Sequence, residues 1–287
     1  MKRAISTSSL ASGVEVRRGA YGLSLTGVDG VEELLVAARG WPTLELVRRL
    51  GSSDAREDVL GPETALIRLV GGGELAVERR PLRATYTLPR PISDVELIHP
   101  YLAPTAGIVA RWLGRESFHA GAFATDEGTW VFLGGKGAGK SSTLAWLAQR
   151  GVAIVADDVV VVEDDRVFAG PRTIDLREDG ARALGVGDRL DGGERERWRV
   201  QLDPVAPELA LRGWIVSSWG SGPPELAAVP APDRLRALAR SRVIGVATEA
   251  PDLLLRLAAL PAFEFRRSPG WDRFERDVES LLAGLSV

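Results

Sequence analysis

The stretch Gly134-Gly135-Lys136-Gly137-Ala138-Gly139-Lys140-Ser141 matches the pattern G-x-x-x-x-G-K-[ST], which is typical of a loop that binds phosphate groups. Its glycines let the backbone wrap closely around a chain of phosphates, and N–H groups of the loop and the following helix then point at anionic oxygens. Lys140 can reach the β- and γ-phosphates, and the Ser141 hydroxyl can ligate magnesium. The stretch therefore predicts a P-loop that binds a nucleoside triphosphate with Mg²⁺, and Ser142, which follows directly, is included among its binding residues.

The residues on either side of this loop supply the strand–loop–helix setting that the motif requires. An apolar strand is expected at 130–133 before the loop, and a helix from Lys140 to about Arg150 after it. Gly151 then stands in the usual position of a glycine at a helix C-terminus. The alternative is a glycine-rich turn that matches the pattern by chance, and the flanking elements argue against it.

Two adjacent aspartates, Asp157 and Asp158, follow the short apolar stretch 152–156. A helix of about ten residues carries the chain roughly 15 Å away from the phosphates, and a strand of five residues brings it back by roughly 16 Å. The pair should therefore lie near the γ-phosphate, where one carboxylate can hold magnesium and the other can accept a proton from an attacking hydroxyl. The alternative is that both are turn residues that lead into the next strand, because aspartate is common in turns.

These motifs together resemble the catalytic domain of the HPr kinase/phosphorylase family and its small stand-alone relatives, with a more distant likeness to ATP-dependent phosphoenolpyruvate carboxykinases. The resemblance covers roughly residues 95–287 and is strongest over 118–177. It rests on the following segments: His119-Ala120-Gly121, the P-loop, Gly151 to Asp158, Leu260-Pro261, Phe263-Glu264-Phe265 and Trp271-Asp272.

The resemblance implies roles for individual residues. Asp157 would be the base that deprotonates a hydroxyl, Asp158 would help to hold the metal with Ser141, and His119 would lie near the phosphates beside the catalytic Lys140. His119 could instead be a structural histidine at a strand end, and His99 is an equally plausible candidate from the residues alone. Further residues could complete the site or could be solvated surface charges: Arg172, Asp175, Arg177, Arg195, Arg197 and Arg199.

The leading hypothesis is an ATP- and Mg²⁺-dependent kinase that phosphorylates a hydroxyl. The resemblance implies a serine of a peptide or small protein, such as a ribosomally made precursor peptide, and a small-molecule alcohol is the nearest variant. HPr itself is not the expected acceptor, because the N-terminal region differs from that of HPr kinases. Ser142 also stands where the family often has glutamate. Two alternatives stay open: a nucleotide-binding regulatory module with little catalysis, and a phosphoserine phosphohydrolase or phosphorylase.

Composition excludes several classes of protein. The net charge is −3, which disfavours a nucleic-acid or membrane-surface partner, and the chain has no cysteine for disulfides, thiolate catalysis or a cysteine zinc site. It has no signal-peptide core and no apolar run long enough for a membrane span, so a cytoplasmic protein is expected. The sequence also contains no asparagine, which removes the guanine-reading N-K-x-D motif and favours ATP.

The expected fold is α/β, a twisted mixed sheet with the P-loop at the carboxyl end of a strand and an HPr kinase/PEP carboxykinase-like core. Residues 1–95 are expected to form a β-rich N-terminal region and 96–287 the catalytic domain. Helices are expected at 31–38, 106–113, 231–240 and near the C-terminus, a surface loop at 178–200, and strands at 64–70 and 74–79 (a hairpin), 83–88, 118–124, 129–133, 159–162, 166–169 and 211–216.

Overall fold

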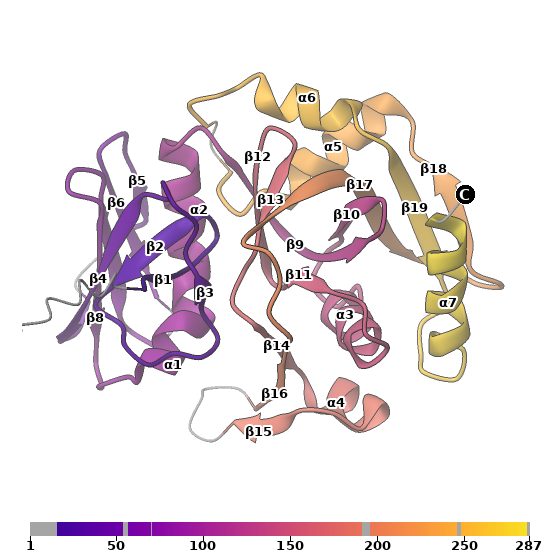
Figure 1. The fold of residues 1–287 in the computed structure, drawn as a ribbon, viewed down its shortest axis with the longest axis horizontal. Coiled ribbons are helices and arrows are strands. Elements are labelled where there is room, and N and C mark those ends of the chain that lie inside the picture. The colour runs from indigo at the N-terminus through magenta and orange to yellow at the C-terminus, as the bar shows by residue number, and fades with distance from the viewer. Residues whose placement is uncertain (1–15, 54–56, 70, 191–195, 246–247, 286–287) are drawn as a thin grey trace, which may run out of the picture.

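The computed structural model describes residues 16–285 apart from 54–56, 70, 191–195 and 246–247. It is a mixed α/β fold with two large sheets, which stand side by side with helix α2 (Leu102–Trp112) between them (Figure 1). No helix in the described part of the chain is long and apolar enough to cross a membrane.

The N-terminal sheet has eight strands in the order β3-β1-β2-β4-β8-β7-β6-β5. The pairs β2–β4 and β4–β8 are parallel, and the other neighbours are antiparallel. The predicted hairpin around three glycines is confirmed as β6 and β7. The strands are β1 (Arg18–Ala20), β2 (Leu23–Thr26), β3 (Leu35–Val36), β4 (Thr43–Leu50), β5 (Val59–Leu60), β6 (Thr64–Arg68), β7 (Glu74–Glu78) and β8 (Arg83–Leu88).

The helix predicted at 31–38 is wrong. Val31, Leu34 and Leu35 are buried at a helix-like spacing, but the chain turns there, and Leu35 pairs with Gly19 at the edge of the N-terminal sheet. Tertiary packing of these three apolar side chains overrides the weak local preference for a helix.

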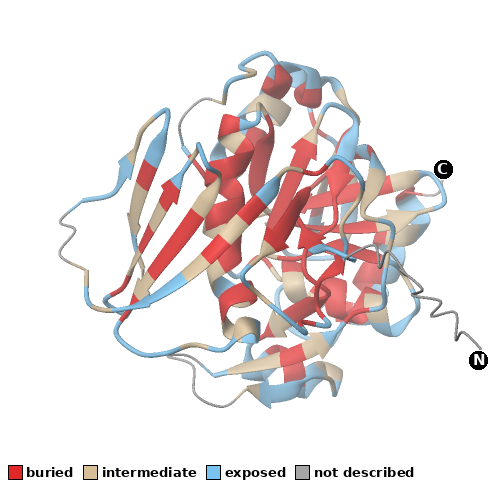
Figure 2. Ribbon diagram, turned by 60° about the vertical axis from the view of Figure 1, so that its left-hand side comes forward, coloured by how far each residue is buried: buried red, intermediate tan, exposed pale blue. Residues whose placement is uncertain are grey.

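A helical segment joins the two sheets and contains α1 (Asp94–Glu96), the π-helical turn η1 (Leu97–Tyr101) and α2. Helix α2 contacts β7 on one side and β9 and β12 on the other, so one apolar core spans both sheets. Figure 2 shows buried residues along α2 and along the strands on either side of it. The predicted domain boundary near residue 95 falls within α1, and the division into two domains stays a prediction.

The second sheet has the order β10-β9-β12-β13-β17-β19-β18, with β11 added beside β9 and a further pairing of β10 with β17. The strands β10, β17 and β19 run parallel, and β9 runs antiparallel to both β10 and β11, so β11 has the same direction as β10. The strands are β9 (Glu116–Thr125), β10 (Gly128–Leu133), β11 (Ile154–Ala156), β12 (Val159–Glu163), β13 (Arg166–Phe168), β17 (Glu208–Trp219), β18 (Glu225–Ala228) and β19 (Ala262–Arg267).

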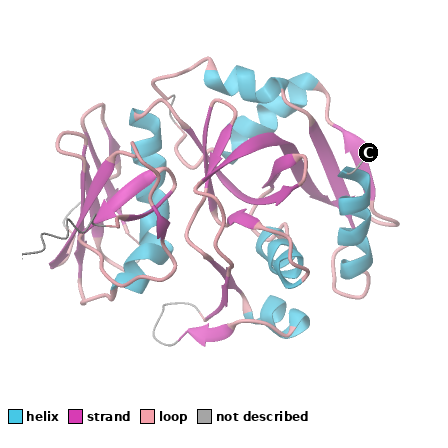
Figure 3. Ribbon diagram, viewed as in Figure 1, coloured by secondary structure: helices cyan, strands magenta, loops and turns pink. Residues whose placement is uncertain are grey.

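Helices cover both faces of this sheet (Figure 3). Along β10, Trp130 and Phe132 pack with α3 (Lys140–Gln149) and α7 (Phe274–Leu285), whereas Val131 and Leu133 pack with α5 (Ala231–Ser241) and α6 (Leu253–Ala259). Alternate residues of a strand point to opposite faces, so both faces of β10 are apolar and buried.

A small third sheet, β14-β16-β15, lies below α3 with helix α4 (Glu178–Leu184). Its strands are β14 (Thr173–Leu176), β15 (Asp188–Leu190) and β16 (Arg197–Gln201), so the surface loop predicted at 178–200 is wrong over its described residues. In β16 the apolar Trp198 and Val200 alternate with polar residues and pack towards the core that contains α3. That period of two, and Gly185 at the end of α4 with a φ of +66°, are the local signals that favour ordered structure.

Candidate functional site

The carboxyl ends of β10, β11, β17 and β19 meet at one edge of the second sheet, because these strands share one direction. The glycine-rich loop (residues 134–141) follows β10, and the aspartate pair follows β11. His119 lies at the same edge, since its neighbour Ala120 pairs with Leu133, the last residue of β10. This edge opens into a cavity of about 840 Å³. Ligands in open α/β sheets typically bind at such an edge.

Most of the predicted site residues line this cavity: Lys136, Gly137, Ala138, Gly139, Lys140, Ser141, Ser142, His119, Asp157 and Asp158. Gly134 and Gly135 do not line it. Their carbonyl oxygens accept hydrogen bonds from Nζ of Lys140, at 2.7 and 3.3 Å. The ammonium group is therefore held over its own loop. Burial lowers the pKa of Lys140, and the charges of Asp157 and Asp158 act in the opposite direction.

Glycine is required at position 139, where the loop becomes α3. Gly139 has a φ of +81°, and a Cβ there would lie 2.5 Å from Nη2 of Arg267. A residue with a side chain would strain the backbone and push against that guanidinium. The loop is therefore packed tightly against the end of β19.

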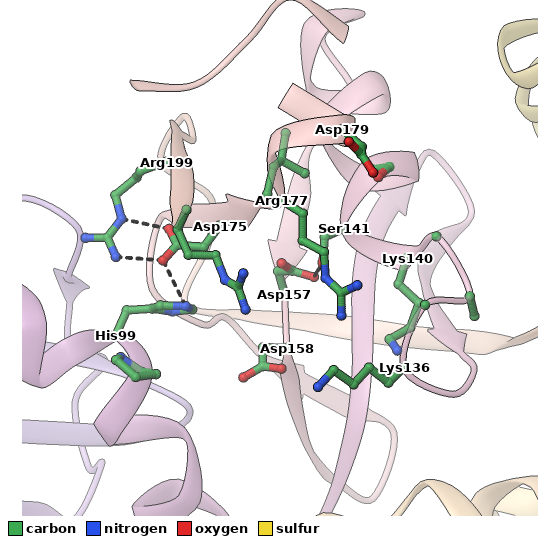
Figure 4. Close-up of a pocket in the computed structure, with 18 of the residues that line it drawn as sticks. His99, Lys136, Lys140, Ser141, Asp157, Asp158, Asp175, Arg177, Asp179 and Arg199 are labelled. Atoms are coloured by element: carbon green, nitrogen blue, oxygen red, sulfur yellow. Dashed lines mark hydrogen bonds and ion pairs between the residues drawn. The ribbon is translucent and has the colours of Figure 1, made fainter. Parts of the chain in front are cut away.

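Asp157 is buried at the bottom of the cavity, where the Ser141 hydroxyl donates a hydrogen bond to its Oδ1 at 3.1 Å (Figure 4). The structure thus returns Asp157 to the end of the glycine-rich loop, as the lengths of the helix and the strand predict. Burial and, to a smaller extent, the charge of Asp158 raise the pKa of Asp157 to about 7, although the Ser141 hydrogen bond and Lys140 oppose the rise. At neutral pH this carboxyl group can both accept and release a proton.

Asp158 has a left-handed backbone, with a φ of +68°, which aspartate tolerates better than most residues. Its carbonyl oxygen accepts hydrogen bonds from the N–H of Ala120 and from Nδ1 of His119, at 3.2 and 3.0 Å. Nδ1 therefore carries the hydrogen, because a carbonyl oxygen can only accept. His119 also lies 3.3 Å from Oδ1 of Asp158. Burial raises the pKa of Asp158, but the hydrogen bond and charge of His119, together with the charges of His99 and Lys140, hold the pKa below its usual value.

His99, the other histidine in the chain, also lines the cavity. Its Nε2 lies 3.1 Å from Oδ2 of Asp175, which receives two further bonds from Arg199, Nε to Oδ1 at 2.8 Å and Nη2 to Oδ2 at 3.0 Å (Figure 4). Nη1 of Arg199 lies 3.8 Å from Glu33 of the N-terminal region. Burial lowers the pKa of His99, and Asp175 opposes this. These four charged or titratable side chains form a network that connects the N-terminal region, the joining segment and the small sheet beside the cavity.

The N-terminal sheet reaches the aspartate pair through Tyr21, at the turn between β1 and β2. Tyr21 is buried, and its backbone N–H donates to the carbonyl of Ala169 at 2.8 Å. Burial raises the pKa of Tyr21 well above its usual value, and the charges of Asp158 and Asp157 add to the effect. The aspartate pair is therefore close enough to this buried tyrosine of the N-terminal region for its charges to act on it.

The predicted arginines have different positions. Arg172 does not line the cavity. It is buried and donates to the backbone carbonyls of Ile154, Val155 and Asp203, so it supports β11 from behind. Arg177 lines the cavity from the start of α4 and reaches into the same space as Asp157 (Figure 4). Arg197 and Arg199 also line it, and Arg195 falls outside the described residues.

Several residues that line the cavity have no role predicted from the sequence, among them Trp219, Arg267 and Trp271. Trp219 and Arg267 are the last residues of β17 and β19, and Trp271 precedes α7. The alternation of Phe263 and Phe265 in β19 is a strand signal that would have led to Arg267. Nothing local in the sequence shows that the ends of β17 and β19 meet the glycine-rich loop.

The donors around Ser141 suit magnesium. A hydroxyl and carboxylates are hard oxygen ligands, and Mg²⁺ is usually held by one or two carboxylates together with substrate phosphates. Among the residues that the structure describes, no three His, Asp or Glu side chains are grouped as they are in a metal centre made by protein alone. Ser141 and Asp158, which both line the cavity, could supply such oxygen ligands to a magnesium ion brought in with a phosphate ligand.

No protein-family model matches the chain, and no curated protein matches it. The solved structures that match include the HPr(Ser) kinase/phosphatase from Coxiella burnetii, which is 12% identical, with a TM-score of 0.30. The match covers 60% of this chain and 97% of that one. Both the sequence identity and the TM-score of this match are low, so the match says nothing about the chemistry of the site.

Proposed function

We propose that this chain is an ATP- and Mg²⁺-dependent kinase that transfers the γ-phosphoryl group to a hydroxyl, with a serine of a peptide or small protein as its acceptor. The observation that carries the proposal is the position and ionisation of Asp157. Its carboxyl group is buried, lies 3.1 Å from the hydroxyl of the last residue of a G-x-x-x-x-G-K-S loop, and has a pKa of about 7.

The glycine-rich loop supports binding of a triphosphate. It lies between β10 and α3, and its lysine is held over the loop, where β- and γ-phosphates lie in P-loop proteins. Ser141 and Asp158 would hold Mg²⁺, which neutralises phosphate charge when it is bound. Lys140 would add its own positive charge on the same oxygens. ATP is the proposed nucleotide because the sequence has no asparagine for a guanine-reading motif.

Asp157 would act as the general base. The bond between the γ-phosphorus and the β–γ bridging oxygen breaks, a bond from the acceptor oxygen to the γ-phosphorus forms, and the hydroxyl proton passes to Asp157. ADP leaves with the bridging oxygen. A base with a pKa near the working pH is ionised often enough to accept the proton and is still basic enough to bind it. The rate of transfer should therefore rise as the pH increases through about 7.

The shape of the cavity supports an acceptor that is larger than a small alcohol. Its volume of about 840 Å³ is in the upper part of the range for ligand sites. It continues past the aspartate pair to Val95 and Tyr101 of the joining segment and to Leu190 of β15. A nucleotide at the glycine-rich loop would leave this side open to a peptide segment. Arg177 would lie beside the transferred group.

The acceptor class can be tested with degenerate peptide pools that contain one serine, one threonine, one tyrosine or no hydroxyl residue, each incubated with MgATP. Mass spectrometry should find one added phosphoryl group in the serine pool with the wild type and none with Asp157→Asn. Transfer to glycerol or another small alcohol, with none to any pool, would move the proposal to a small-molecule kinase. ATP binding with no transfer to any acceptor would favour a nucleotide-binding regulatory module.

A further inference from the structure

A strip of aromatic and guanidinium groups lies along the cavity on the β17 and β19 side of the glycine-rich loop. It consists of Trp219, Arg267, Phe274 and Trp271, and all four line the cavity. Cζ of Arg267 lies 4.5 Å from the ring centroid of Trp219 and 4.9 Å from that of Phe274. The ring of Phe274 is in turn 5.0 Å from that of Trp271, centroid to centroid. The strip is therefore continuous from one tryptophan to the other.

The two tryptophans at its ends are unusually exposed for side chains of this size. Trp219 is 44% and Trp271 is 38% exposed. In the described part of the chain no other aromatic residue is exposed, and both of these face one cavity. An indole ring held open to a cavity leaves its π-face available to a planar ligand.

Arg267 joins this strip to the phosphate end of the cavity. It is only 3% exposed, and its Nε has no hydrogen-bond partner among the described residues. A Cβ added to Gly139 would meet Nη2 of Arg267 at 2.5 Å and Cη2 of Trp219 at 3.5 Å, so the strip begins directly at the loop. Burial lowers the pKa of Arg267, and the charge of the buried Asp277 acts in the opposite direction. A guanidinium that lines the cavity and places Nη2 beside Gly139 is suited to a phosphate or ribose oxygen.

The order of strands in the sheet decides which part of a nucleotide the strip would meet. The aspartate pair follows β11, on the β9 side of β10, whereas Trp219 and Arg267 end β17 and β19 on the other side of β10. The γ-phosphate must face the aspartates for transfer to occur. The base is at the opposite end of the nucleotide, so it extends towards the strip.

We propose that Trp219 and Trp271 form the site for the nucleotide base, a planar heterocycle stacked on their open faces, and that Arg267 binds the ribose–phosphate portion beside Gly139. This inference rests on the proposed nucleotide site, which it makes more specific. Because the base would stack on the tryptophans, ATP should bind more tightly than a chain of phosphates that has no base.

The test compares MgATP with magnesium tripolyphosphate, which has the phosphates but no base, by titration calorimetry. Trp219→Leu and Trp271→Leu should each weaken ATP binding by roughly 5- to 100-fold and leave tripolyphosphate binding within about twofold of the wild type, because stacking on a base is worth about 1–3 kcal/mol. Trp219→Phe keeps an aromatic face and should retain most of the affinity. Circular dichroism checks that each variant is folded.

Three results would overturn the inference, and they are distinguishable. If both leucine variants bind ATP as the wild type does, while Lys140→Ala loses both ligands, the base lies elsewhere and the phosphate site stands. If the wild type binds neither ATP nor tripolyphosphate, or if Lys140→Ala binds both unchanged, the nucleotide site itself fails and the base site fails with it. Equal weakening of ATP and tripolyphosphate in the leucine variants would also overturn it, because the strip would then act on phosphates alone.

Discussion

As the pH rises, ionisation of Asp157 should lower the free energy of unfolding of the wild type. Replacing Asp157 by asparagine should abolish this decrease. Burial raises the pKa of Asp157 from 3.8 to about 7 in the folded chain. Between these two values the folded chain binds more protons than the unfolded chain, so the free energy of unfolding decreases as the pH increases. Asparagine resembles the protonated carboxyl group in shape and carries no charge at any pH, so the variant lacks this contribution.

The size of the effect follows from the difference in pKa. Each unit corresponds to about 1.4 kcal/mol, so the full shift destabilises the wild type by about 4 kcal/mol at about pH 8. At about pH 5 only the unfolded carboxyl has ionised, and the corresponding loss is about 1.5 kcal/mol. Between these pH values the wild type should therefore lose about 2.5 kcal/mol more than Asp157→Asn.

Urea unfolding followed by tryptophan fluorescence, without nucleotide, measures this difference at several pH values. Asp165→Asn is the matched control, because Asp165 belongs to a second Asp-Asp pair in the exposed turn between β12 and β13, outside the cavity. Its stability should change with pH as that of the wild type does. If the stability of Asp157→Asn also changes in parallel with that of the wild type from about pH 5 to 8, Asp157 has an ordinary pKa and is not a base tuned to neutral pH.

Two further pairs of variants distinguish residues that stabilise the fold from residues that act in ATP binding or phosphoryl transfer. Gly139→Ala should lower the free energy of unfolding by about 1–3 kcal/mol and weaken ATP binding, because its φ is +81° and its Cβ would collide with Arg267. Gly151→Ala, with a φ of +78° and open space around it, should show only the backbone cost of about 1 kcal/mol and unchanged ATP binding. Arg172→Ala should destabilise the fold by about 2–4 kcal/mol in urea unfolding, because buried carbonyls lose their donors. Arg177→Ala should change the free energy of unfolding by no more than about 0.5 kcal/mol and should slow phosphoryl transfer. These assignments would be contradicted if the two glycine variants, or the two arginine variants, behaved alike.

The local part of the site could be predicted from the sequence. The glycine-rich loop, α3 and β11 follow one another directly, so the lengths of a helix and a strand are enough to return Asp157 to Ser141, which the structure places 3.1 Å apart. The hairpin β6–β7 could be predicted for the same reason, because both strands and their glycine turn are contiguous.

The rest depends on contacts between segments that are far apart in the sequence. Arg267 reaches the loop only because β19 pairs with β17, and β17 pairs with β10. Glu33 reaches Arg199 only because the N-terminal sheet packs across α2 onto the second sheet. Arg172 has the same charge as Arg177 but supports backbone carbonyls from behind the site, and no local pattern distinguishes the two.

The most direct test of the account is transfer of the labelled γ-phosphoryl group of ATP, with magnesium, in a lysate of the protein's own host. The wild type, Asp157→Asn, Lys140→Ala and Asp165→Asn are compared in parallel, and ATP binding is measured for each. We expect one labelled species with the wild type and Asp165→Asn, none with the other two proteins, and loss of ATP binding only in Lys140→Ala. If Asp157→Asn labels the same species at the wild-type rate, or if no protein labels anything although ATP is bound, Asp157 is not the base of a kinase.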